Sequence, residues 1–357
     1  MEWFIETRFG DPVLSLHLRS SGLVYGTALG QIGYFDIPLK THTILTELAE
    51  ESIRGIFLAA ESVIYAAVGD LYVICFYKSQ QDEAWSYDPL SHEGRVHTSV
   101  LCHATQIFQH GPKVCLILTE EEIDVLSSHC QPQCFITDAD ASETKEFKGL
   151  ILPKHAVPLA FNEDRLLWLD RSPGGQQALH LISFAPFAEH CFKSFEARDG
   201  QLAHFHLFEE VVFFVRNFRT VCLVSVVGDG VVQVLGRHSA DIAAICPVRT
   251  SGSPEGSSVR DPMFQPGDVV VSVDVQGVLR IWSKGGLLEE IAVTSHAKVA
   301  IDHAERLFAL GYPYCLAVSS PYIAFSTDLG IFLVISRYLR NLEGDVELYE
   351  NSGHQTN

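Results

Sequence analysis

The sequence predicts an all-β protein, a seven-bladed β-propeller whose ring is closed by the N-terminal strand. Three observations lead to this fold. The chain of 357 residues carries many short apolar runs that end at Gly, Asp, Asn or Pro. A pattern of strand, glycine turn and strand returns along the chain at a spacing that suits four-stranded blades. Finally, the extended apolar segment 2–9 has no other predicted role.

The strand signals come first, because they set the fold class. Each run is short and rich in β-branched and aromatic residues, which favours strands over helices. The main runs are VLSLHL (13–18), VIYAAV (63–68), LYVICFY (71–77), KVCLIL (113–118), EVVFFV (210–215), TVCLVSVV (220–227), DVVVSVD (268–274) and PYIAFS (321–326).

The hairpins come next. GTALGQIGYFDI (26–37), SVDVQGVLRIWS (272–283) and STDLGIFLVIS (326–336) align with Gly30, Gly277 and Gly330 at the turn. Weaker versions of the pattern lie at 67–77, 118–128, 166–184 and 213–226. Together these segments predict seven antiparallel hairpins, each at the centre of one blade.

Closure of the ring needs one more strand after Ser336. The segment EWFIETRF (2–9) can supply it, and pairing it there would protect an exposed sheet edge. The rival closing strand is DVELYE (345–350), which is more acidic. We therefore expect a single propeller domain over 1–340, followed by a polar C-terminal tail over 341–357.

Two additions exceed what a minimal blade needs. The segment 249–267 is rich in Gly, Ser and Pro, and it is predicted to be an inserted flexible loop. The segment 296–310 has helical periodicity, with an apolar stripe that includes Leu307 and Phe308. This stripe must be buried on the propeller or against another protein, so Leu307 and Phe308 are candidate partner contacts.

One predicted blade contains recognisable motif residues. LGRHSADIAAICPV (235–248) offers Gly236 and His238, and DVVVSVDVQGVLRIWS (268–283) ends in Trp282 and Ser283. This unit resembles the WD-repeat family of β-propellers, whose repeats open with Gly-His and close with Trp-Asp.

The resemblance also implies a buried network. In that family a His, a Ser or Thr, a turn Asp and the Trp bond to one another, and His238, Ser272 and Trp282 match three of these positions. Val275 occupies the fourth position, so the network is expected to be incomplete. Asp328 matches the turn acid of the last unit.

Composition limits the classes of function. No apolar run approaches the roughly 20 residues that a membrane span needs. The formal charge of −19 disfavours nucleic acids and anionic membranes. The N-terminus has no secretory pattern, and nine cysteines lie mostly in apolar runs, which favours a reducing compartment. An intracellular, cytoplasmic protein is expected, with nuclear and ciliary locations left open.

Catalytic and metal-binding patterns are weak. The chain lacks the GxSxG, GxxxxGK[ST] and HExxH motifs. His129, Cys130 and Cys134 could hold zinc, and His204 and His206 could hold a metal from one strand face, but a loop and half-buried polar residues explain them as well. No catalytic, cofactor or metal site is predicted, and the acidic run 120–124 is interpreted as a charged hairpin tip.

The predicted function is therefore a non-catalytic scaffold for protein–protein interaction, a subunit of a larger complex with protein partners of unknown identity. Two alternatives remain. One is a propeller hydrolase with an axial active site. The other is a phosphoinositide-binding propeller, although LGRHSADI (235–242) offers only Arg237 where that group carries paired arginines, so membrane recruitment is not favoured.

Overall fold

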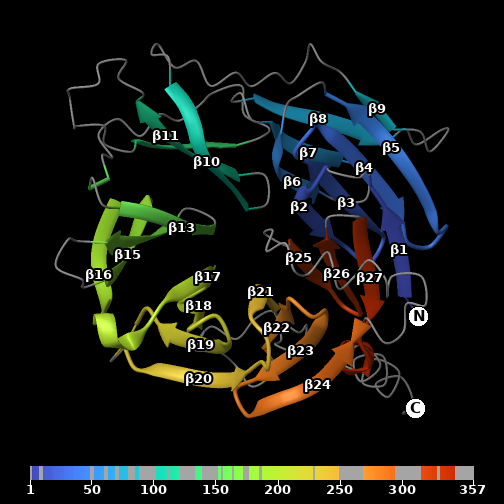
Figure 1. The fold of residues 1–357 in the computed structure, drawn as a ribbon. Helices are drawn as coiled ribbons and strands as arrows, with labels where there is room; N and C mark the ends of the chain where they lie inside the picture. Colours follow the sequence, from blue (N-terminus) through green and yellow to red (C-terminus); the bar gives the residue numbers. More distant parts are fainter. Residues whose placement is uncertain are drawn as a thin grey trace, which may run out of the picture. The chain divides into compact units, whose positions relative to one another are not determined.

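The computed structural model describes residues 2–7, 11–48, 52–59, 63–68, 72–78, 85–87, 102–110, 113–120, 133–138, 152–153, 156–162, 165–171, 177–184, 187–227, 230–248, 268–293, 315–327 and 330–341. Nearly all of these residues form antiparallel β-sheets (Figure 1). The all-β class predicted from the sequence is confirmed. No helix in the described ranges is long and apolar enough to cross a membrane.

The chain divides into two compact units. One consists of Val13–His17 and Ser21–Gly200, and the other of Met1–Pro12, Leu18–Ser20 and Gln201–Asn357. The prediction of one propeller domain over 1–340 stays a prediction. The predicted loop 249–267, the predicted helix 296–310 with Leu307 and Phe308, the rival strand 345–350 and Asp328 lie outside the described residues.

The first unit holds four sheets, each with its strands in chain order. The strands are β2 (Val13–Leu18), β3 (Gly22–Thr27), β4 (Gln31–Asp36) and β5 (Thr41–Glu47); β6 (Ile53–Ala59), β7 (Val63–Val68), β8 (Tyr72–Lys78) and β9 (Trp85–Tyr87); β10 (Cys102–His110), β11 (Lys113–Glu120) and β12 (Gln133–Asp138); and β13 (Ala156–Asn162), β14 (Arg165–Arg171), β15 (Gln177–Phe184) and β16 (Phe187–Phe195). Val24, Ile32, Ile53 and Ile64 are among the fully buried side chains that join the first two sheets.

The second unit holds three sheets of four strands. They are β17 (Leu202–Phe208), β18 (Val211–Arg216), β19 (Thr220–Ser225) and β20 (Val232–Arg237); β21 (Ile242–Val248), β22 (Val269–Asp274), β23 (Val278–Ser283) and β24 (Gly286–Ala292); and β25 (Leu316–Ser319), β26 (Tyr322–Thr327), β27 (Gly330–Ile335) and β1 (Glu2–Glu6). A short 3-10 helix, Ala197–Asp199, precedes β17.

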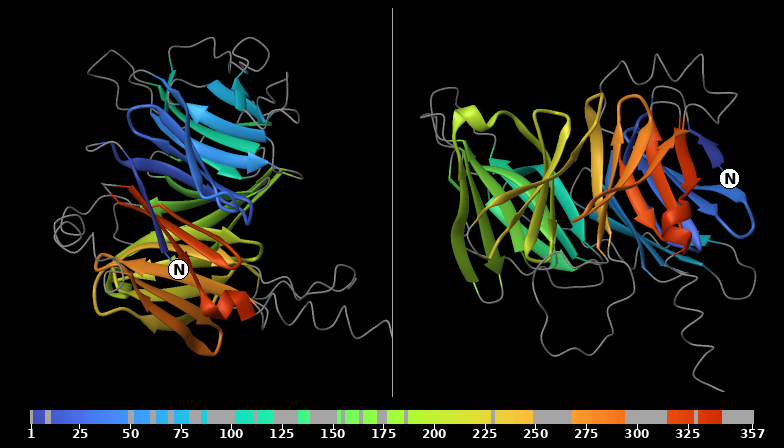
Figure 2. Two further views of the ribbon diagram at one scale, coloured as in Figure 1. Left: turned by 90° about the vertical axis from the view of Figure 1, so that its right-hand side faces the viewer. Right: turned by 90° about the horizontal axis from the view of Figure 1, so that it is seen from below.

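The N-terminal strand is the outer strand of the last sheet. β1 pairs antiparallel with β27, from Glu2 opposite Val334 to Glu6 opposite Gly330. Both views of Figure 2 place the N-terminal strand against the red C-terminal strands. A Cβ atom on Gly330 would collide with the backbone of Ile5, so the close approach of the two strands requires glycine at this position.

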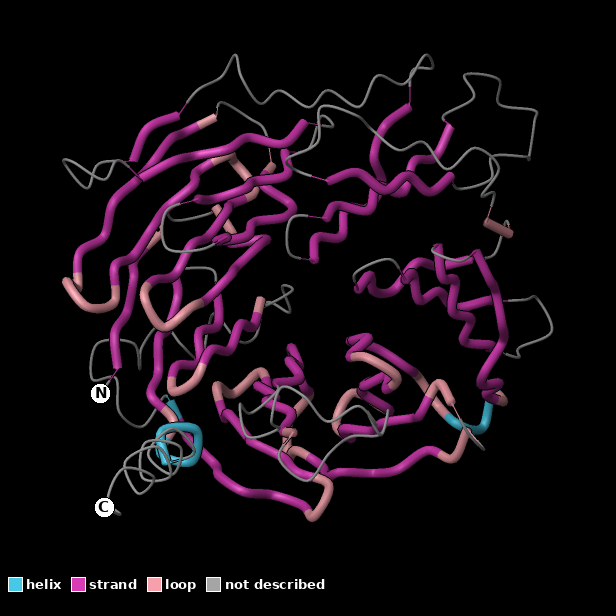
Figure 3. The backbone as a smooth tube through the Cα atoms, turned by 180° about the vertical axis from the view of Figure 1, so that it is seen from behind, coloured by secondary structure: helices cyan, strands magenta, loops and turns pink. Residues whose placement is uncertain are grey.

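A five-residue helix over 337–341 follows β27 and is coloured cyan near the C-terminal end in Figure 3. Ser336 caps it, since Leu339 N donates to Ser336 Oγ over 3.0 Å. Glu289 of β24 adds its carboxylate at the same end, where it accepts from Arg337 N at 3.2 Å and Tyr338 N at 3.0 Å. The acid satisfies helix donors that have no partner within the helix.

Candidate functional site: a buried polar network and the surface beside it

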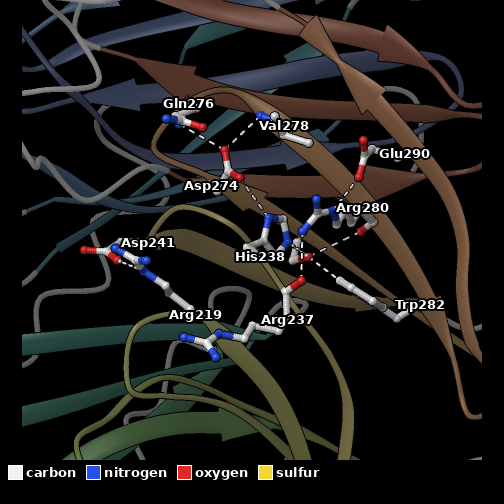
Figure 4. A network of polar contacts seen from close by, with 11 residues as sticks. Arg219, Arg237, His238, Asp241, Asp274, Gln276, Val278, Arg280, Trp282 and Glu290 are labelled. Atoms are coloured by element: carbon white, nitrogen blue, oxygen red, sulfur yellow. Dashed lines mark hydrogen bonds and ion pairs between the residues drawn. The ribbon is translucent and has the colours of Figure 1, made fainter.

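The sheet β21–β24 encloses a chain of hydrogen bonds that begins at the indole of Trp282. Trp282 Nε1 donates to Ser272 Oγ over 2.7 Å, and the same oxygen lies 2.7 Å from His238 Nε2. His238 Nδ1 lies 2.9 Å from Asp274 Oδ2. Figure 4 shows His238 between this hydroxyl and the carboxylate. All four side chains are buried.

The acid of this network is Asp274, which corrects the prediction that Val275 occupies its place. Asp274 Oδ1 accepts from Gln276 N at 2.9 Å and from Val278 N at 3.0 Å. Asp274 is the last residue of β22, so its carboxylate oxygen can accept hydrogen bonds from the backbone amides of the turn that follows it. The network is therefore complete and not interrupted.

The hydrogen positions follow from the acceptors. The ionised carboxylate of Asp274 accepts only, so His238 Nδ1 donates to it. Ser272 Oγ accepts from Trp282 Nε1 and lies within hydrogen-bond distance of His238 Nε2 and of the Arg280 carbonyl. Each buried polar atom in the chain finds a partner, which removes the cost of burial without hydrogen bonds.

Glycine makes room for the tryptophan. A Cβ atom on Gly236 of β20 would collide with the Trp282 ring. The ring thus lies against Gly236 of the neighbouring sheet, in one core with Leu223, Leu235 and Val270. The sequence analysis identified both Gly236 and His238. Gly236 leaves space for the indole of Trp282, and His238 is linked to the same indole through the hydroxyl of Ser272.

Ser272, His238 and Asp274 also have the order of a hydrolytic triad. The side chains of His238 and Asp274 are 0% exposed, and Ser272 is 0% exposed as a residue. The lone pair that a nucleophile would use faces the Trp282 N–H. A substrate carbonyl cannot reach this hydroxyl while the sheet is intact, so this geometry describes a structural network.

Arginines surround the network on its outer side. Arg280 Nε donates to Glu290 Oε2 at 2.7 Å, and its Nη1 donates to the carbonyl of Arg237 at 2.9 Å. Arg219 Nε donates to Asp241 Oδ1, also at 2.7 Å. These bonds tie β20 to β23 and the β18–β19 turn to the start of β21.

The remaining candidate ligands do not assemble. His204 and His206 reach the surface of β17, where a bulge lies between Ala203 and His206. The surrounding protein lowers the pKa of both, that of His206 to about 4, with a smaller contribution from the charge of His204. No group of three metal-ligating side chains occurs among the described residues. His129, Cys130 and residues 121–124 lie outside them.

The comparisons with known proteins found a similar fold but did not identify a family. No protein-family model matches the chain, and no curated protein matches it. The chain is similar to the crystal structure of the computationally designed Ika8 protein, with a TM-score of 0.50 and 12% identity. The match covers 94% of this chain and 100% of that one. At this identity the likeness concerns the fold alone.

Proposed function

We propose that the chain is a seven-bladed, WD-repeat-like propeller closed by β1, and that it serves as a non-catalytic protein–protein interaction subunit of a larger intracellular complex. The observation that carries this proposal is the Trp282–Ser272–His238–Asp274 network, which is complete, buried and committed to structure. It is the arrangement expected of a WD-type repeat, and such repeats commonly present loops to partner proteins.

The hydrolase alternative has one observation in its favour, the order of Ser272, His238 and Asp274. Burial of all three argues against it, because a nucleophile must be within reach of its substrate. The phosphoinositide alternative rests on Arg237, which is exposed but stands without a second adjacent arginine in sequence.

Affinity capture from native cells tests the proposal. The tag belongs at the C-terminus, because the N-terminal strand is part of a sheet. We expect partner proteins that remain bound through purification and are identified by mass spectrometry. A preparation from cells that express the tag alone serves as the control for non-specific capture. Recovery of the chain alone, at native concentration, would contradict the scaffold proposal.

A second measurement addresses the hydrolase. Purified protein is incubated with p-nitrophenyl esters and a fluorogenic serine-hydrolase probe. We expect no labelling of Ser272 by mass spectrometry in the native state. Labelling of Ser272 would favour the hydrolase and contradict the purely structural role of this network.

A further inference from the structure

The turn between β18 and β19 carries an aromatic residue where a glycine is expected. Asn217 and Phe218 have φ angles of 50° and 61°, and Arg219 N donates across the turn to Arg216 O. Two central residues of positive φ define a type I′ turn, which favours Asn followed by Gly. A bulky side chain in this conformation is strained. In the corresponding hairpins of two other sheets, glycine takes the positive φ: Gly30 and Gly277.

Backbone hydrogen bonds to neighbouring segments fix the strained turn. Phe218 O accepts from Ile242 N at 2.6 Å, and Asn217 N donates to Gln201 O at 2.8 Å. Gln201 N returns a bond to Asn217 Oδ1 at 3.1 Å. The Phe218 side chain is nevertheless 47% exposed. The ring therefore gains little from burial in the fold, while its backbone is fixed in a costly conformation.

Two arginines belong to the strands of the same sheet. Arg216 stands opposite Thr220, and Thr220 stands opposite Arg237, so the three side chains share one face of the sheet. Neither Arg216 nor Arg237 has an acidic partner among the described residues. Figure 4 shows Arg237 extending beside the Arg219–Asp241 pair.

The local charge is opposite in sign to that of the whole chain. Arg216, Arg219, Arg237 and Arg280 belong to this region together with two exposed acids, Asp241 and Glu290. Gln201, which is hydrogen-bonded to Asn217, follows Glu196, Arg198 and Asp199, so the surplus is one positive charge. The whole chain carries −19. A short acidic segment responds mainly to charges within a Debye length of about 8–10 Å, so it is attracted here. An anionic membrane is broad and meets the repulsion of the whole chain.

We propose that Phe218, Arg216 and Arg237 form a docking site for an acidic segment of a partner protein that carries an apolar side chain beside its carboxylates. Phe218 packs on the apolar side chain, and the two guanidinium groups pair with the carboxylates. The rigid turn lowers the ordering cost of binding. This inference rests on the proposed interaction function and specifies the site and the chemistry of the partner.

The test uses the purified full chain and a fluorescein-labelled peptide of glutamate, leucine and phenylalanine, followed by fluorescence anisotropy. The same peptide with glutamine in place of glutamate measures the role of charge. We expect the acidic peptide to bind, the glutamine peptide to bind at least about tenfold more weakly, and high salt to weaken the acidic peptide. Equal binding of the two peptides would overturn the proposal.

Phe218→Gly separates docking from folding. Glycine suits the positive φ, so we expect an unchanged or higher Tm together with at least about tenfold weaker binding of the acidic peptide. Arg216→Glu combined with Arg237→Glu should abolish binding. Lys284→Glu is the matched control, because it reverses an exposed charge at the β23–β24 turn, and it should bind like the wild type. Wild-type affinity in Phe218→Gly, or a lowered Tm, would overturn the proposal.

Two further outcomes have separate meanings. The first uses vesicles of phosphatidylcholine and a phosphatidylinositol phosphate. If the wild type binds these vesicles and the Arg216→Glu, Arg237→Glu protein does not, the site is a lipid site and the peptide proposal is wrong. If native capture recovers the same partners with wild type and Phe218→Gly, the docking site is wrong while the scaffold role stands. Failure of the wild type to capture any partner would instead contradict the scaffold role.

Discussion

Single residues carry much of the stability of the sheet β21–β24, and Asp274 is the most connected of them. Its carboxylate serves His238 and two backbone amides of the turn. Asp274→Ala leaves the buried His238 donor and two part-buried turn amides without acceptors, so we expect a loss of about 3 kcal/mol in the free energy of unfolding. Urea unfolding followed by fluorescence measures it. Asp274→Asn keeps an acceptor for the turn amides and should lose less; equal losses would contradict this account.

Trp282 contributes by volume more than by its hydrogen bond. Trp282→Ala opens a cavity against Gly236 and removes the donor to Ser272, for an expected loss of about 3–5 kcal/mol. Trp282→Phe keeps most of the ring and should lose about 1–3 kcal/mol, the cost of removing the buried donor to Ser272 Oγ. Both values come from the same urea experiment. An unchanged midpoint for the alanine variant would show that the indole does not hold the two sheets together.

Three thiols that the protein shields from water should be inert in the native protein, Cys222 being buried and Cys246 and Cys315 half-buried. Burial raises the pKa of Cys246 from 9.0 to about 12, and those of Cys222 and Cys315 to about 11. Below pH 9 these groups are protonated in both states and stability does not depend on them. Between pH 9 and about 12 the unfolded thiols ionise first, so stability falls as pH rises. Iodoacetamide at pH 8 should label the exposed Cys191 well before Cys246, as read by peptide mass spectrometry.

Part of this network could be predicted from the sequence. His238, Ser272 and Trp282 were identified because their spacing along two strands resembles a known repeat. Asp274 was missed, because the place of the acid depends on how far the turn before Gly277 extends, and Asp274 and Val275 are adjacent. The strain at Phe218 has no signature in the sequence, since Asn-Phe is not a recognised turn pair and only the φ angles show it.

At the scale of the element, local patterns predicted most strands and missed long-range caps. VLSLHL became β2 with the predicted bounds, and six of the predicted hairpins lie between the second and third strands of their sheets. In the seventh, 118–128, only the end of β11 is described. The helix over 337–341 was not predicted, because the carboxylate that stabilises it comes from Glu289, 48 residues before Arg337.

The β1–β27 pairing is testable through one glycine. Gly330→Ala places a Cβ atom against the Ile5 backbone at a φ of 154°, so β1 should detach. We expect faster hydrogen exchange in β27 and lower solubility from the newly exposed edge. Gly286→Ala is the control, because its φ is 121° but nothing lies near its Cβ position. If hydrogen exchange in β27 is equally fast in the two variants, backbone strain alone explains the effect, and the collision with Ile5 does not detach β1.

At the scale of the whole molecule, the described residues hold seven sheets, and the proposal joins them in one ring. A closed ring should unfold as one cooperative unit, because each sheet supports its neighbours. Hydrogen exchange with mass spectrometry in rising urea measures this. We expect β14, from the first unit, and β22, from the second, to lose protection at the same urea concentration. Separate midpoints would show two independent units and contradict the closed ring.

The strand pairing of the last sheet also has a consequence for biosynthesis. Glu2 is synthesised before its partner Val334, which is added to the chain 332 residues later. At about 5–20 residues per second, β1 waits roughly 15–70 s for the strand that completes its sheet. Throughout this interval the nascent chain carries a strand with free backbone donors and acceptors. Cellular yield should therefore depend on chaperones that bind the emerging N-terminus, and slow translation should lower it.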